Sequence, residues 1–334
     1  MRRLLTLGAF AALLTAGLAS CTSDSSRLTV YSGRTENLIG PLLEQFSEET
    51  GIGIDVRYGQ SADLALLIDE EGDRTPADVF ISQSPGAVSF LDEANRLGEL
   101  PAGVLERVPE GDRPEDRTWV GLSARVRVLV YNPEEVDEAD LPDSVLDMTD
   151  ERFSGDVAVA PENGSFQDFV TAMRSELGDD EAAAWLEGMA ANDSPVYANN
   201  TAIVEAVGRG EVPMGLVNHY YGYRALEEDP DLPVANHAFA SDDIGSIPLV
   251  TAASTLRDTG LAEDAHALLE FLLSEQAQRF FTEETFEYPL LPDVPPADIL
   301  PPIDELTGRG VDVAELSGGL EATRDLIASS GIED

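Results

Sequence analysis

The segment LTVYSGRTENLIGPLLEQFSEETG, residues 28–51, decides the fold class of this chain. Residues 28–32 are rich in strand-forming side chains and alternate in polarity, a pattern typical of a β-strand. After Gly33, four apolar side chains recur at helical spacing, and a second glycine, Gly51, follows as a usual helix terminator. The segment therefore predicts a strand that leads directly into a helix.

The same alternation continues along the chain. Residues 52–58 resemble a strand, 62–68 a helix and 77–81 a short buried strand, and the order strand, helix, strand, helix, strand predicts a parallel α/β arrangement. Residues 119–132 form a long strand-like run. Further patterns predict helices at 85–97, 182–189, 203–207, 265–273 and 320–328, strands at 157–160, 213–217 and 246–250, a loop at 101–116 and a linker at 289–302. Two α/β lobes would leave a cleft at the carboxyl ends of their strands.

The first residues have the layout of an export signal. Arg2 and Arg3 precede an apolar run that ends at Ala19-Ser20, and the run is short for a membrane span. The junction before Cys21 resembles a bacterial lipobox, which implies cleavage after residues 1–20, a lipid on Cys21 and a polar tether over residues 21–27. An ordinary secretory signal is the alternative. We expect an exported protein that is anchored to the outer face of the cell membrane, or periplasmic, and that touches the membrane only through its lipid.

The chain is strongly acidic. Its 334 residues carry a formal net charge of -44, and all 20 basic residues are arginine. Such a charge repels phosphate backbones, so it argues against nucleic-acid binding. The acidity fits either a halophilic host or a GC-rich genome and says little about function.

The residues most suggestive of function are the adjacent phenols Tyr220 and Tyr221 in the segment VNHYYGYR, residues 217–224. They follow a predicted strand, where a turn aims side chains toward a cleft. A phenol has a pKa near 10, but a hard trivalent cation stabilises the phenolate, and ferric iron suits two adjacent phenols. The alternative is that both rings pack against a neighbouring helix. We expect the preceding His219 to be structural, because in a strand its side chain would point away from that of Tyr220.

The segment Asn218-His219-Tyr220-Tyr221 resembles the ferric-ion-binding motif of iron-transport substrate-binding proteins. Other segments are similar to the same family in the same order, and together they cover nearly all of the mature chain: residues 28–34, 76–80, 123–132, 197–207 and 287–290. The resemblance implies an α/β chain with the type II periplasmic-binding-protein fold, in which two α/β lobes are joined by two crossover strands around an interlobe cleft. We place the N-lobe at 28–126 plus 250–300 and the C-lobe at 127–249 plus 301–334.

The resemblance also implies an Fe(III) site with Tyr220 and Tyr221 as ligands. The family commonly adds a histidine and a glutamate, but the corresponding positions here hold Thr35 and Gln83. Glu36 is the nearest hard oxygen donor to Thr35, and we keep Glu36 and Gln83 as weaker metal candidates. The loop that supplies a third tyrosine in some relatives has none here.

The family completes the metal shell with a synergistic anion such as carbonate or phosphate. We expect hydrogen-bond donors to this anion at four places: a predicted helix start, one face of the long strand, the residues beside the tyrosines, and the residue after Gly33. The anion-binding candidates are Arg34, Arg125, Arg127, Asn163, Gly164, Ser165, Asn200 and Asn218. For each arginine, a salt bridge with one of the many acids is the alternative.

The sequence contains no nucleophile elbow, zinc-protease motif or Walker loop, so we do not expect an enzyme. The predicted function is capture of Fe(III) for delivery to an ABC permease by a monomeric lipoprotein. The same fold binding an oxyanion or a small organic solute without metal is the alternative.

Overall fold

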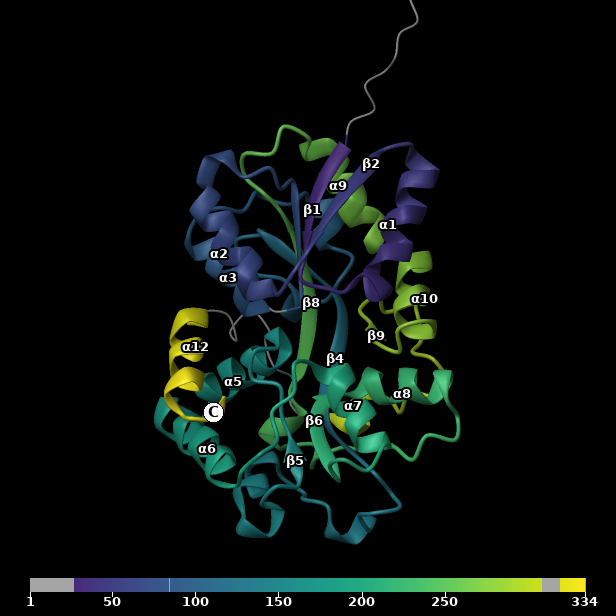
Figure 1. Ribbon diagram of the computed structural model, residues 1–334. Coiled ribbons are helices and arrows are strands. Elements are labelled where there is room, and N and C mark those ends of the chain that lie inside the picture. Colours follow the sequence, from purple (N-terminus) through teal and green to yellow (C-terminus); the bar gives the residue numbers. More distant parts are fainter. Residues whose placement is uncertain (1–26, 84, 308–318, 334) are drawn as a thin grey trace, which may run out of the picture.

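The computed structural model describes residues 27–83, 85–307 and 319–333. Figure 1 shows two stacked bodies with strands at their centres and helices outside. The strands follow the order β2-β1-β3-β8-β4-β6-β5, with β7 and β9 paired to β4. Their bounds are β1 Arg27–Ser32, β2 Gly53–Tyr58, β3 Val79–Ser82, β4 Trp119–Tyr131, β5 Val157–Ala158, β6 Met214–Asn218, β7 Ala235–His237, β8 Pro248–Thr255 and β9 Tyr288–Pro289.

The first body contains the opening of the chain and a later return. β1 pairs in parallel with β2 and β3, while β8 joins β3 in antiparallel orientation. Gly51 ends the first helix in the left-handed conformation, with φ of 77°, a backbone shape that suits glycine. The helices of this body are α1 Glu36–Thr50, α2 Ser61–Glu71, α3 Pro85–Glu93, α4 Ala102–Leu105, α9 Ala262–Leu272 and α10 Glu275–Glu283.

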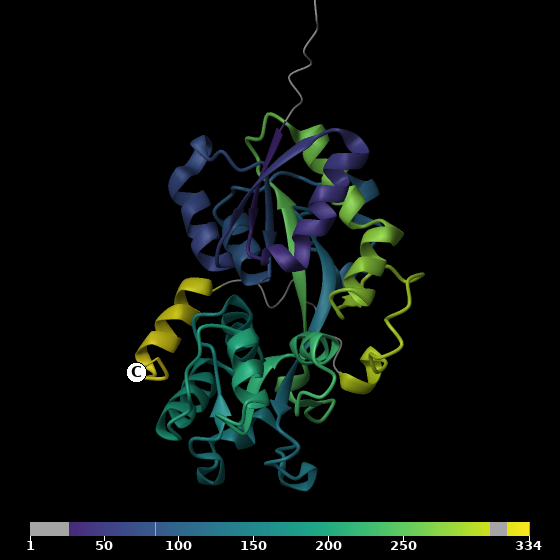
Figure 2. The same cartoon turned by 45° about the vertical axis from the view of Figure 1, so that its right-hand side comes forward.

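The second body surrounds β5, β6 and the far half of β4. α5 is the first helix after β5, and α8 begins directly after β6. Figure 2 shows this body below the first, with helices around its strands. The helices on this side are α5 Gly164–Leu177, α6 Asp179–Ala191, α7 Asn200–Gly208, α8 His219–Glu228, α11 Ile303–Leu306 and α12 Leu320–Ser329.

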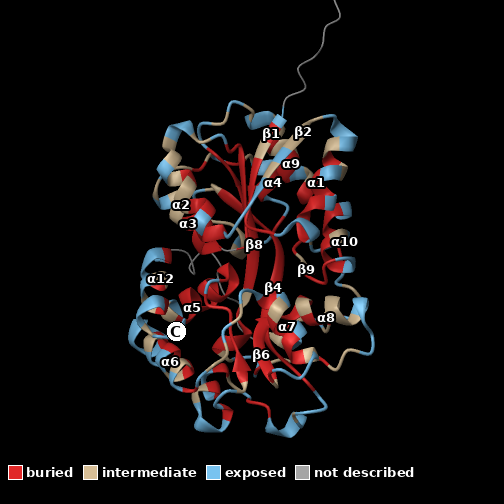
Figure 3. Cartoon of the chain, viewed as in Figure 1, coloured by how far each residue is buried: buried red, intermediate tan, exposed pale blue. Residues whose placement is uncertain are grey.

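Two long strands connect the bodies. Residues 119–126 of β4 pair with β8, and residues 127–131 of the same strand pair with β6. All 13 residues of β4 are buried, so the strand is covered by protein along its whole length as it passes from one body to the other. Burial is highest along β4 and β8 and falls toward the outer helices (Figure 3). One core cluster lies in the first body, and it also includes Tyr220 from the second.

Most predicted elements are present, with three differences. The sheet is mixed rather than parallel, because β8 runs antiparallel to both of its neighbours, β3 and β4. The strand expected at 246–250 begins at Pro248 and extends to Thr255, and the loop expected at 101–116 includes the short helix α4. Residues 1–26, which include the predicted signal and Cys21, lie outside the described residues. Among the described helices, none combines the length and apolarity that a membrane crossing requires.

Candidate functional site

A cleft of about 810 Å³ lies between the two bodies. The first body supplies the loop after β1, the end of β2 and Gln83. The second supplies the starts of α5 and α7 and one face of α8. These are carboxyl ends of strands and amino ends of helices, where α/β proteins bind ligands.

The adjacent tyrosines open helix α8 at the inner edge of this cleft. Tyr221 lines the cleft, and Tyr220 lies beneath it with no exposed surface. Their ring centroids are 4.4 Å apart, with an angle of 31° between the ring planes. The Asn218 side-chain amide donates to the Tyr220 hydroxyl at 3.4 Å. The structure therefore brings two phenols together at one point of the cleft wall.

The pKa of Tyr220 lies well above its usual value. Burial is the main cause, and electrostatic interactions with Tyr221 and Glu287 add to it, while Arg34 and Arg125 act in the opposite direction. Without a cation the Tyr220 phenol is therefore neutral, and a metal ion would have to displace its proton.

His219 contacts backbone groups rather than the cleft. Its Nδ1 accepts from the Val126 backbone N–H at 3.3 Å, and its Nε2 lies 2.8 Å from the Phe286 carbonyl oxygen. Burial lowers the pKa of His219 to about 4, so the ring is neutral. Our reason for expecting a structural role, that a strand would point His219 away from Tyr220, is wrong, because β6 ends at Asn218 and helix α8 begins at His219. Its position between Val126 and Phe286 nevertheless fits the structural role that we expected.

Arg125 and Arg127 point from β4 toward the start of α5. Arg125 donates to the Gln83 carbonyl oxygen and lies 3.2 Å from the Asp168 carboxylate. Arg127 donates to Asn218 Oδ1 at 3.1 Å, and burial together with the charge of Arg125 lowers its pKa to about 9. Arg125 Nε, Arg125 Nη1 and Arg127 Nε are buried without a hydrogen-bond partner in the structure. Unsatisfied buried donors of this kind favour a bound anion.

The start of α5 is a polar cluster that faces both arginines. Asn163 caps the helix, and its Oδ1 accepts from the Ser165 backbone N–H at 3.1 Å and from Ser165 Oγ at 2.6 Å. Asn200 donates to Ser165 Oγ at 3.2 Å. A Cβ on Gly164 would lie 3.8 Å from Ser61 Cβ of the opposite body, so this helix start lies where the bodies meet.

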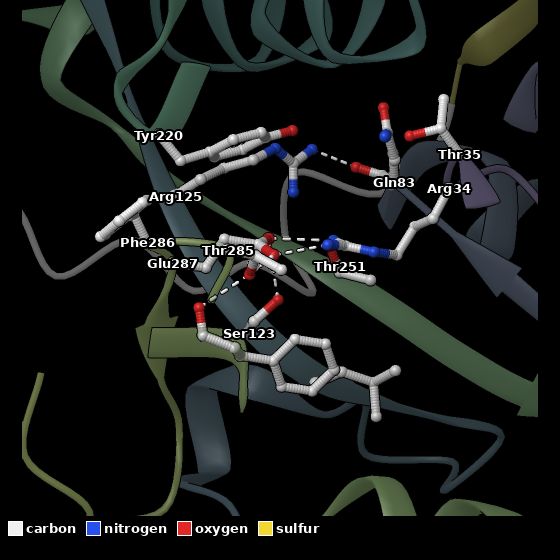
Figure 4. Close-up of polar contacts among 12 residues, drawn as sticks. Arg34, Thr35, Gln83, Ser123, Arg125, Tyr220, Thr251, Thr285, Phe286 and Glu287 are labelled. Carbon is white, nitrogen blue, oxygen red and sulfur yellow. Dashed lines mark hydrogen bonds and ion pairs between the residues drawn. The ribbon is translucent and has the colours of Figure 1, made fainter. Parts of the chain in front are cut away.

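Arg34 forms a buried ion pair that sequence reasoning missed. Its two terminal nitrogens contact both carboxylate oxygens of Glu287, and Nη1 also donates to Thr251 Oγ1 at 2.7 Å (Figure 4). The other carboxylate contacts come from Ser123 Oγ at 3.0 Å and Thr285 Oγ1 at 2.9 Å. Only Nε of Arg34 lacks a partner, so its terminal nitrogens are not free for an anion.

The remaining candidates lie at different depths. Gln83 lines the cleft, and its backbone N–H donates to Ser61 Oγ at 3.0 Å. Thr35 also lines the cleft, but Glu36 is exposed and lines a separate hollow beside α1. Within the ranges that the structure describes, no group of three or more His, Cys, Asp or Glu residues is arranged to hold a metal ion.

The chain is similar to known proteins along most of its length. The family model described as "Bacterial extracellular solute-binding protein" matches residues 74–305. The "Major ferric iron-binding protein" of Neisseria meningitidis serogroup B is 32% identical over 326 residues, which cover 96% of this chain and 98% of that protein. The "Fe(3+)-binding periplasmic protein" of Serratia marcescens is 29% identical over 304 residues, 90% of this chain and 89% of that protein.

Among solved structures, iron-bound HitA from Pseudomonas aeruginosa is 33% identical and superposes with a TM-score of 0.87 over 92% of this chain and 99% of HitA. This likeness confirms the expected fold of the type II periplasmic-binding proteins. Because the family model spans most of the chain and the Neisseria relative aligns along nearly all of it, the chain belongs to the bacterial extracellular solute-binding proteins, a family of transport proteins rather than enzymes.

Proposed function

We propose that this protein captures ferric iron in the cleft between its lobes and delivers it to an ABC permease. Tyr220 and Tyr221 would bind the ion as phenolates. The observation that carries the proposal is that their rings lie 4.4 Å apart at the cleft, with Tyr221 lining it and Tyr220 directly beneath, because hard phenolate oxygens suit a trivalent ion. The names of the Neisseria and Serratia relatives and the iron-bound state of HitA support it.

An exogenous anion would complete the coordination shell. The unpartnered N–H groups of Arg125 and Arg127 and the capped start of α5 at Asn163 are suited to hold it. Carbonate and phosphate both fit this donor set. Arg34 would act indirectly, because Glu287 already occupies its terminal nitrogens.

Capture would involve movement of the lobes about the two crossover strands. We assign residues 28–126 plus 250–300 to the N-lobe and 127–249 plus 301–334 to the C-lobe, so β4 is divided where its pairing changes from β8 to β6. The protein would be exported by the signal at residues 1–20, carry lipid on Cys21 and work as a monomer on the outer side of the membrane.

The test is an absorption titration of the metal-stripped protein with ferric nitrilotriacetate, with and without bicarbonate. Phenolate bound to ferric iron absorbs visible light, whereas a metal-free complex of the same fold does not. We expect a saturable band at equal amounts of iron and protein, which strengthens with bicarbonate. Absence of the band under all anion conditions would contradict the proposal.

A further inference from the structure

Helix α12 contacts both bodies at a place away from the two crossover strands. It packs on α5 and α6 of the second body and on α3 of the first. Figures 1 and 2 both show this helix, in yellow beside the C-terminus, at the outer edge of the molecule, whereas β4 and β8 run through the centre. The contacts of α12 therefore join the bodies independently of β4 and β8.

The second body holds most of α12. Thr323 is buried, and its hydroxyl lies 2.8 Å from Thr171 Oγ1 of α5. Arg174 of α5 donates to Thr323 Oγ1 at 2.8 Å and to the Gly319 carbonyl oxygen, just before α12, at 3.0 Å. Farther along the helix, Ile327 belongs to the apolar core of the second body. These contacts make α12 part of the second body, so the helix would move with it.

The start of α12 reaches the first body. Leu320 is 3% exposed and belongs to the apolar core of the first body, not to that of the second. The Arg324 guanidinium lies 3.3 Å from the Asp63 carboxylate of α2. Because Arg324 follows Leu320 by four residues, both lie on one face of the helix. The helix thus presents one apolar and one charged side chain to the first body.

The apolar contact is the stronger of the two. Removal of a leucine side chain from water is a large favourable contribution to packing. The side chains of Arg324 and Asp63 are 39% and 64% exposed, so water screens their ion pair, and exposed pairs contribute little to stability. Leu320 therefore provides most of the attachment, and the ion pair adds a smaller, salt-dependent part.

The bodies also meet directly beside the cleft. Tyr220 of the second body belongs to the apolar core of the first, and α5 contacts α3. Iron-bound HitA superposes on both bodies at once, with a TM-score of 0.87 over 92% of this chain. The structure therefore describes the lobes in contact with each other, the arrangement in which α12 reaches α2 and α3.

From these contacts we infer that α12 is a latch that holds the two lobes closed over the cleft. Separation of the lobes would pull Leu320 out of the first body and break the Arg324–Asp63 pair, while β4 and β8 stay intact. A contact made only in the closed state shifts the equilibrium toward closure, and a cargo that needs this state binds more tightly as a result. The inference goes beyond the proposed function, because it concerns lobe closure and not the identity of the cargo.

Leu320→Ala in the full chain tests the latch. The protein is loaded with ferric nitrilotriacetate and bicarbonate, excess EDTA is added, and the decay of the visible phenolate band gives the rate of iron release. We expect release about tenfold faster than in wild type, because the closed state loses a buried leucine contact. Leu326→Ala is the matched control, since Leu326 is on the same helix but packs against the core of the second body. Equal rates in the two variants would overturn the latch.

The ion pair provides a second test that leaves the apolar cores intact. Asp63→Arg places two like charges opposite each other and should speed iron release at low salt by up to about fivefold. Addition of Arg324→Asp should restore the wild-type rate, because the pair is then re-formed with its charges exchanged. A double variant that releases iron as fast as Asp63→Arg would overturn the contact between α12 and α2.

Failure of the proposed function has a different signature. If the wild type forms no phenolate band, ferric binding by the tyrosines is wrong, and the leucine variants are compared as metal-free proteins by small-angle X-ray scattering. The latch then predicts a larger radius of gyration for Leu320→Ala than for Leu326→Ala. Equal radii would overturn it.

Discussion

Arg34 and Glu287 are separated by 253 residues in the chain, yet they form a bidentate ion pair with no solvent-exposed side-chain surface. The pair touches both crossover strands, because Ser123 of β4 and Thr251 of β8 contribute hydroxyl groups to it. Since Arg34 directly precedes Thr35 on the cleft wall, the pair ties the first body's side of the cleft to the two strands that connect the bodies.

We expect Glu287→Gln to lower the free energy of unfolding by about 3–5 kcal/mol, because it leaves the buried Arg34 cation uncompensated. Urea unfolding at neutral pH measures the change. Glu284→Gln is the control: Glu284 is exposed, three residues earlier. Equal stability of the two variants would show that the buried pair is not needed.

Because of the Arg34–Glu287 pair, we expect the free energy of unfolding to fall at acid pH. Burial alone would raise the pKa of Glu287, but the charge and hydrogen bonds of Arg34 outweigh burial, and the pKa is lowered below its usual 4.5. A lowered folded-state pKa gives stability that is present above the unfolded-state value and is lost as pH falls through the folded-state value. We expect wild type to lose stability below about pH 4.5 more steeply than Glu287→Gln in urea titrations. Parallel curves would contradict this assignment.

Tyr220→Phe and Tyr221→Phe each keep the ring and remove one candidate ligand oxygen. Loss of a group that only supports a metal ligand costs roughly 10–100-fold in metal affinity, and we expect each of these variants to lose more than that. The double variant should lose the visible band. Tyr223→Phe, a half-buried phenol on the same helix, should bind iron normally. Thermal unfolding checks that all variants fold. Equal amounts of iron and the double variant in a stable complex would rule out both tyrosines.

Iron binding should release protons. Because the pKa of Tyr220 is raised well above its usual value by burial, the phenol is protonated before the metal arrives, and coordination displaces the proton. Apparent affinity should therefore rise with pH. We expect protons to be released as iron binds in unbuffered solution, and fewer in Tyr220→Phe. Iron uptake without proton release would show that the phenols are not ligands.

Gly33 permits the close approach of the loop after β1 to helix α2. A Cβ at this position would lie 1.9 Å from Ser61 Oγ and 2.9 Å from Ser61 Cβ, so Gly33→Ala should shift the Arg34 loop. We expect a loss of about 1–3 kcal/mol in the free energy of unfolding, measured in urea. Gly260→Ala, where no atom lies within 4 Å of the added Cβ, should change stability little. An unchanged free energy of unfolding in Gly33→Ala would contradict the predicted steric clash with Ser61.

Local patterns in the sequence are sufficient to predict much of the fold. Alternation over residues 28–32 and helical spacing up to Gly51 correspond to β1 and α1, because both elements bury one face and the period is visible in a single stretch. The direction of β8 was not predictable in this way. An antiparallel return depends on which strand it pairs with, and this information is not contained in its own residues.

The candidate site was predicted unevenly for the same reason. Tyr220 and Tyr221 are neighbours in the chain, so a local motif identifies them. The ion pairs of Arg34 with Glu287 and of Arg125 with Asp168 join distant segments, and with 64 acidic residues no pattern selects the partner. The direction of the His219 side chain was argued from strand alternation, but the strand before it ends at Asn218 and α8 begins at His219.

The unbroken strand β4 has a consequence for how the protein unfolds. Its first part belongs to the sheet of one body and its last part to the sheet of the other, so neither body can lose its sheet without exposing a buried segment of its neighbour. Heating should therefore produce a single calorimetric transition whose van't Hoff and calorimetric enthalpies agree, despite the bilobal shape.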